Sequence, residues 1–172
     1  CARTASDTTK DLTSSYTYIG MLNRKLEILR EIILAIPREF YTRQRTGRMP
    51  YDPILEAIEL FADCRGVRLG FVRHADLSFV GQASLRAEGF LSVTPKECVF
   101  QNSKSIVHRD GYSIIRSARR IEGVSSFCVI KRNHIKTQDI ELIKALLVQA
   151  LFLYISLKDA SGIREMPQEN NS

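Results

Sequence analysis

The segment TQDIELIKALLVQALFLYI, residues 137–155, constrains the fold most, because it has apolar residues on every side. A helix with one buried face should carry polar residues on the opposite face. From residue 142 to residue 157, however, the only polar side chains are Lys144, Gln149 and Ser156. This apolar run is shorter than the roughly 18–20 residues of a transmembrane helix, and it contains a lysine. We therefore predict a helix of a folded domain and no membrane span.

Two apolar stripes on this one helix explain its composition. The first stripe is expected to cover the chain's own domain, and the second, at steps of four, three and four, is expected to face a partner. The first comprises Ile140, Ile143, Leu147, Leu151 and Tyr154, and the second comprises Leu142, Leu146, Gln149 and Leu153.

Another long helix is predicted over residues 11–36, before Pro37, which ends it. Its apolar residues recur at steps of three and four, close to the seam of a coiled coil. An ordinary amphipathic helix packed on its own domain is the alternative. We predict a homodimer through the first and last helices, with a seam on the first helix formed by Leu12, Ile19, Leu22, Leu26, Leu29 and Ile33.

The charge balance is moderate and identifies no partner. The 172 residues carry a net charge of +6, which permits an acidic partner without requiring one. Residues 38–50 hold four arginines, but no aromatic residues alternate with them in the manner of a nucleic-acid interface. We interpret this stretch as a basic linker, so binding to nucleic acid is not indicated.

The cysteines and histidines, which could act in catalysis or bind a metal, do not form a recognisable site. The four cysteines, Cys1, Cys64, Cys98 and Cys128, include no CxxC pair, and the three histidines include no pair four residues apart. A dyad of Cys98 and His108 would have no recognisable carboxylate to orient it. We expect no catalytic residue, metal or cofactor, and therefore no enzyme.

Reduced thiols and a polar start, without a signal peptide, predict a cytoplasmic protein. We expect Cys1 to mark a cut within a longer chain, with a processed lipoprotein cysteine as the alternative.

The remaining elements predict an α+β fold with a mainly antiparallel sheet, and with the N- and C-terminal helices packed together on one face. Residues 1–10 and 160–172 are expected to be flexible, residues 11–49 to form the long helix and linker, and residues 50–159 to form the domain. In the domain we expect a helix (52–65), two strands (67–74, 77–86), an insert (87–104) with a short helix (95–101), three strands (105–109, 112–123, 124–132) and the final helix (137–159).

Four stretches of residues 50–158 resemble the GAF domain family, with the PAS family as the nearest rival. They are ILEAIELFADCRGV, SIVHRDGYSIIR, VSSFCVIKR and NHIKTQDIELIKALLVQALFLYI, in that order along the chain. The resemblance implies a sensor or dimerisation module of a signalling or transcription-regulating protein, which binds a small ligand between the sheet and the insert and shifts the flanking helices. The implied pocket comprises Phe90, Cys98, Phe100, Ile114 and Arg116.

Two other functions stay open beside the sensor. One is a GAF-like assembly module that binds no ligand. The other, more remote, is a thiol-dependent reductase, for which the resemblance would require clustered cysteines in the insert, where only Cys98 lies.

A basic cluster at Arg116, Arg119 and Arg120 also allows two interpretations. If these residues continue one strand, Arg116 and Arg120 share a face and Arg119 takes the other. The cluster is then either a solvated sheet surface or a clamp for a phosphate or a carboxylate.

Overall fold

The computed structural model divides the chain into two units, Cys1–Pro50 and Tyr51–Ser172. In the second unit it describes residues 51–99 and 105–159 with their side chains, and the helix backbone as far as residue 163. In the first unit it describes residues 9, 10, 12–17, 19–21, 23–25, 27, 30 and 31, all of them helical.

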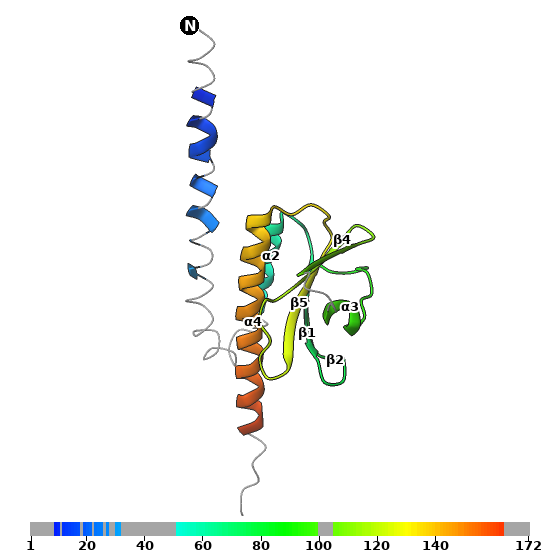
Figure 1. Cartoon of the computed structure of the whole chain (residues 1–172). Coiled ribbons are helices and arrows are strands. Elements are labelled where there is room, and N and C mark those ends of the chain that lie inside the picture. Colours follow the sequence, from blue (N-terminus) through cyan, green and yellow to red (C-terminus); the bar gives the residue numbers. More distant parts are fainter. Residues whose placement is uncertain are drawn as a thin grey trace, which may run out of the picture. The chain divides into compact units, whose positions relative to one another are not determined.

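The described part of the second unit contains a five-stranded sheet with the order β2-β1-β5-β4-β3 (Figure 1). Each neighbouring pair of strands runs antiparallel, as the hairpin signals predicted. The mixed helix and sheet composition agrees with an α+β fold. The strands are β1 (Val67–Arg73), β2 (Ser78–Leu85), β3 (Ile106–Arg109), β4 (Tyr112–Arg116) and β5 (Val124–Ile130).

The hairpin between β3 and β4 turns at Asp110 and Gly111, as the sequence predicts. Both residues have a positive φ, 50° and 82°, which is the conformation of a two-residue turn that matches the twist of the strands. Glu122 and Gly123, with φ of 49° and 74°, make a similar turn between Ile121 and Val124.

β4 ends at Arg116 and is therefore shorter than the predicted strand 112–123. The Ser117 hydroxyl explains this end. It donates to the Arg119 carbonyl over 2.8 Å and accepts from the Ser126 amide over 3.3 Å. The Ser117 amide still donates to the Ser126 carbonyl over 2.9 Å, so the side chain replaces one of the two ladder bonds of this pair. The prediction that Arg116 and Arg120 share one strand face is therefore wrong.

Helices α2 (Asp52–Ala62) and α4 (Thr137–Ile163) cover one face of the sheet, and the short helix α3 (Pro95–Val99) lies on the other (Figure 1). The sequence placed the end of α2 near Arg65. Instead, Asp63 caps the helix in the left-handed conformation, and Gly66, with a φ of 99°, belongs to the connection to β1. α3 begins at Pro95 as predicted, and α4 extends beyond its predicted end at residue 159.

The central strands β1, β5 and β4 are mostly buried, and β5 shows how their residues divide between the two faces of the sheet. The Ser126 hydroxyl donates to the Leu147 carbonyl of α4 over 2.6 Å, so this side of β5 faces the helices. Phe127 and Val129 alternate with it and belong to the hydrophobic cluster next to α3. All seven residues of β5 are buried, including Ser125 and Ser126, which agrees with a strand that is covered on both faces.

The first predicted stripe of α4 packs on the domain. Ile143, Leu147 and Leu151 are fully buried, and the Tyr154 ring stacks on Phe71 of β1 at 4.5 Å. Thr137–Asp159 also has the length and composition of a membrane span, a test that core helices of soluble proteins pass as well. Packing on the sheet accounts for part of this apolar composition, because 39% of the apolar window is buried in the structure.

Candidate functional site

Three of the residues in the implied ligand pocket meet in one hydrophobic cluster, between α3 and the sheet. Cys98 comes from α3, Ile114 from β4 and Phe90 from the loop that leads to α3. Phe100 lies outside the described residues. The buried members of the cluster are Val72, Val93, Cys98, Tyr112, Ile114, Phe127 and Val129, and the half-buried ones are Phe79, Phe90, Leu91 and Val99.

This cluster is filled by the chain's own side chains. Cys98 and Ile114 have an exposed fraction of 0%, so neither borders a space that a water molecule can enter. Phe90 meets Tyr112 edge to face at 5.3 Å, and Phe79 meets Phe127 at 5.7 Å. A ligand that reached Cys98 or Ile114 would have to displace these side chains.

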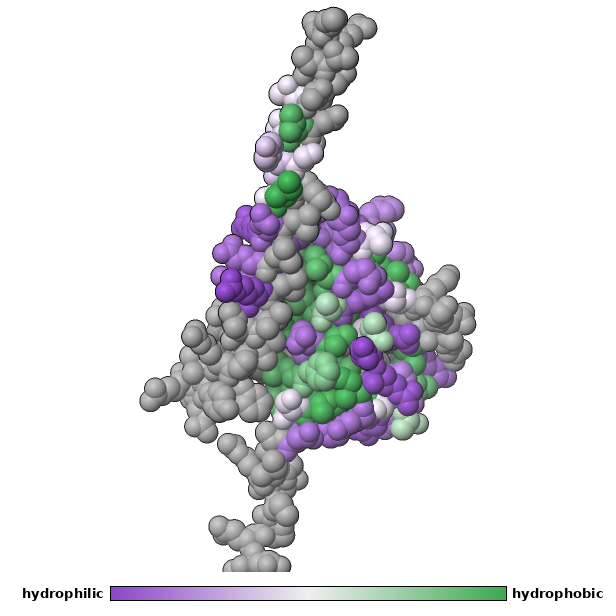
Figure 2. Space-filling model, turned by 60° about the vertical axis from the view of Figure 1, so that its left-hand side comes forward, coloured by the Kyte–Doolittle hydropathy of each residue, from purple (hydrophilic) through white to green (hydrophobic). Residues whose placement is uncertain are grey.

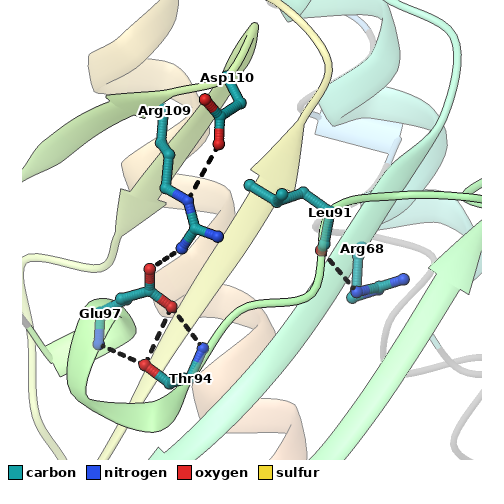
Figure 3. A network of polar contacts seen from close by, with 6 residues as sticks. All are labelled: Arg68, Leu91, Thr94, Glu97, Arg109 and Asp110. Carbon is teal, nitrogen blue, oxygen red and sulfur yellow. Dashed lines mark hydrogen bonds and ion pairs between the residues drawn. The ribbon is translucent and has the colours of Figure 1, made fainter.

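Polar contacts fasten the insert to the sheet, as Figure 3 shows. Thr94 and Glu97 form a capping box at the start of α3: the Thr94 amide donates to Glu97 over 2.6 Å, and the Glu97 amide donates to the Thr94 hydroxyl over 3.4 Å. The other Glu97 oxygen accepts from Arg109 of β3. Arg68 of β1 donates to the Leu91 carbonyl over 3.2 Å. The insert is thereby held from several strands.

Arg116, the fourth described residue of the implied pocket, is the last residue of β4 and lies beside the end of α3. It donates to the Val99 carbonyl at the end of α3, and burial lowers the pKa of its guanidinium. Arg116 is therefore fixed near the hydrophobic cluster as a partly desolvated cation.

A second polar contact, which the sequence analysis missed, involves Glu59 of α2. Glu59 is 8% exposed, and its carboxylate accepts from the Gly66 amide over 2.6 Å and pairs with Arg86 next to the end of β2. The signal for it was an acid on the buried side of a helix, beside Leu55 and Ile58. Such an acid needs a partner inside the fold.

The predicted partner-facing stripe of α4 lies largely inside the chain. Leu146 and Leu153 are 1% and 6% exposed, Leu142 is half-buried and Gln149 is exposed. The apolar residue that points outward is Phe152, which is 54% exposed. Hydrophobic residues gather on the side of the unit that Figure 2 brings forward, which is the side of α4 in Figure 1.

On the N-terminal helical residues, the described part of the predicted seam is open. Leu12 and Ile19 are each 51% exposed, and Tyr16 between them is 71% exposed. The other predicted members, Leu22, Leu26, Leu29 and Ile33, lie outside the described residues, as does the basic linker.

The described cysteines are poor nucleophiles. Burial raises the pKa of the Cys64 and Cys98 thiols to about 12, and it also raises the pKa of Cys128, which is fully buried. Cys98 lies in the cluster next to α3, whereas Cys128 alternates with Phe127 and so faces the helices. The sheet therefore separates these two thiols, and this arrangement gives no support to a reductase.

We predict slow labelling of these thiols by an aromatic disulfide reagent at pH 8. In a Cys1→Ser background, Cys64, Cys98 and Cys128 should react at least about a hundredfold more slowly in the folded chain than in urea, because the thiolate is the reacting form. Mass spectrometry of the labelled peptides gives the rate at each cysteine. Rapid labelling of Cys98 in the folded chain would contradict the buried cluster and reopen the reductase hypothesis.

A further polar group, which includes His74 and Ser125, lies at one end of the sheet, on the α3 face. His74 follows β1, and its Nε2 lies 2.8 Å from the Ser125 hydroxyl of β5. The pKa of His74 is lowered, first by burial and then by the positive charges of Arg120 and Arg116. Among the described residues, no group of three His, Cys, Asp or Glu side chains is placed to hold a metal ion.

No protein-family model matches the chain, and neither a curated protein nor a solved structure matches it.

Proposed function

We propose that this chain is a regulatory dimerisation module of a cytoplasmic signalling or transcription-regulating protein, with a GAF-like sensor unit at residues 50–159. Two copies associate through their long helices, and a helix shift passes the signal to an output domain. The element order and the position of the insert opposite α2 and α4 support this proposal.

The observation that carries the dimer is the exposed apolar seam of the N-terminal helical residues. Leu12, Tyr16 and Ile19, at steps of four and three, lie on one side of a helix and are each at least half exposed. Contiguous apolar surface of this kind is stabilised when a second helix covers it. A second copy of the chain offers the same seam and so a self-complementary partner.

The ligand-free assembly module is the second candidate, and the filled cluster at Cys98 and Ile114 favours it. An assembly module needs no cavity, whereas a sensor needs a place for its ligand. The two candidates share the dimer and differ in whether a small molecule binds.

Sedimentation equilibrium of the full chain tests the dimer. We expect a dimer at tens of micromolar, and an Ile19→Glu variant whose dissociation constant is at least about thirtyfold higher, because a charge replaces an apolar side chain that the dimer would cover. Ser14→Glu, on the opposite side of the same helix, is the matched control and should leave the constant unchanged. A wild-type chain that stays monomeric at high micromolar concentration, or equal effects of the two variants, would overturn the proposal.

A further inference from the structure

The polar group at the end of the sheet combines residues from three strands or their ends. Ser125 of β5 pairs with Val72 of β1, and Arg116 of β4 pairs with Phe127 of β5. Since Val72 and Phe127 belong to the cluster on the α3 face, Ser125 and Arg116 lie on that same face. His74, two residues after Val72, joins them through its contact with Ser125.

This end of the sheet is positively charged. The positive charges of Arg116 and Arg120 both act to lower the pKa of His74, and Arg120 directly precedes Ile121, which bridges to Val124 next to Ser125. The nearest acids along the chain are engaged with other bases: Asp76 pairs with Arg73 at 3.2 Å, and Glu122 pairs with Lys158 at 3.7 Å. Like charges that gather at a partly desolvated position repel one another, and an added anion relieves that repulsion.

An apolar surface adjoins these charges. Phe79 of β2 pairs with Val72, lies against Phe127 and is itself only half-buried. The hydroxyl of Ser125, the N–H groups of two arginines and an aromatic edge therefore occur together. Arginine N–H groups match the oxygens of a carboxylate or a phosphate, and the aromatic edge suits an apolar body.

We propose that His74, Arg116, Arg120 and Ser125 form a binding site for a small organic anion, a carboxylate or a phosphate ester whose apolar part packs beside Phe79. This proposal names the ligand class of the sensor unit and in that respect rests on the proposed function. The proposed site lies at the charged end of the sheet, whereas the pocket implied by the family resemblance lies in the filled cluster at Cys98 and Ile114.

A nuclear magnetic resonance titration of the full chain tests the site with benzoate, phenyl phosphate and uncharged benzyl alcohol as probes. We expect saturable shifts at His74 and Ser125 with at least one anion, and a rise in the pKa of His74 in the complex, because a nearby anion favours the imidazolium. The anion that binds more tightly distinguishes a carboxylate ligand from a phosphate ligand.

The dissociation constants of arginine variants show which side chains bind the anion. Arg120→Gln should raise the dissociation constant of the anion about tenfold or more, the loss expected for one charge-assisted hydrogen bond. Arg119→Gln removes the same charge one residue away and should change the constant by less than about twofold. Because Arg116 also holds the insert, Arg116→Gln is compared only after a urea titration has shown that it folds.

Three results would overturn the site: no saturable shift with either anion, equally tight binding of benzyl alcohol, or equal losses in the two exposed variants. The titration is repeated on the Ile19→Glu chain, because anion binding belongs to the second unit and should persist there. If the chain dimerises but binds no anion, the anion site is wrong and the assembly module remains as the proposed function. If the chain is monomeric but binds the anion, only the proposed dimer is wrong.

Discussion

Replacing Leu153 with glutamate should lower the free energy of unfolding by about 4 kcal/mol, whereas Phe152→Glu should lower it by less than about 1 kcal/mol. Both residues lie in the middle of α4, one position apart, but Leu153 is 6% exposed and Phe152 is 54% exposed. Leu153→Glu places a charge among apolar side chains and removes a well-packed one. At Phe152 the carboxylate stays in water.

Urea unfolding followed by circular dichroism measures both changes, at a protein concentration low enough to keep the chain monomeric. The sequence pattern assigned Leu153 to the partner interface, which predicts a loss of dimer with the fold intact. Burial predicts a loss of folding instead. Equal and small effects at the two positions would show that this side of α4 is not part of the chain's own core.

Gly70→Ala should also destabilise the fold, by about 2–3 kcal/mol. A Cβ atom at Gly70 would lie 2.3 Å from Cζ and 2.5 Å from Cε1 of Phe127, far inside van der Waals contact. The Phe127 ring is 1% exposed and packs against Phe79, so it has little room to move away. Alanine is otherwise better than glycine in a strand by roughly 0.5–1 kcal/mol, which makes a large loss diagnostic of the clash.

A double-mutant cycle with Phe127→Leu isolates this contact. If the ring causes the loss, Gly70→Ala should cost at least about 1 kcal/mol less in the Phe127→Leu background. Gly81→Ala is the control on the neighbouring strand, where the new Cβ would lie 3.2 Å from a Tyr154 ring atom, and it should have the smaller effect. Strict additivity of the two changes would contradict this account.

The local signals in the sequence predicted the elements well. The Asp110-Gly111 turn, the start of α3 at Thr94-Pro95 and the first stripe of α4 depend on neighbouring residues, and all three occur in the structure. Phe90, Cys98 and Ile114, which the family resemblance implied as pocket residues, lie in one hydrophobic cluster, whereas their role as a ligand pocket stays a prediction.

The failures depended on residues that are distant in sequence. β4 ends at Arg116 because the Ser117 side chain bonds to Ser126, and no strand pattern reports that contact. On the second stripe of α4, Leu146 and Leu153 are buried, and periodicity cannot tell two buried sides of a helix from one buried and one exposed side. Phe127 meets Gly70 across the pairing of β1 with β5, and Glu59 meets Arg86 from 27 residues away. Predicting either contact requires knowing how the strands pair.

In the proposed sensor, the contacts between α4 and the sheet restrict how a helix shift can travel along α4. The Leu147 carbonyl accepts from Ser126, and further along the helix the Tyr154 ring stacks on Phe71 while its hydroxyl donates to the Val80 carbonyl over 3.4 Å. A piston-like slide of one helical turn, about 5.4 Å, would break all three contacts and expose apolar surface. We therefore expect α4 and the sheet to tilt together as one lever, so that the displacement grows with distance from the sheet.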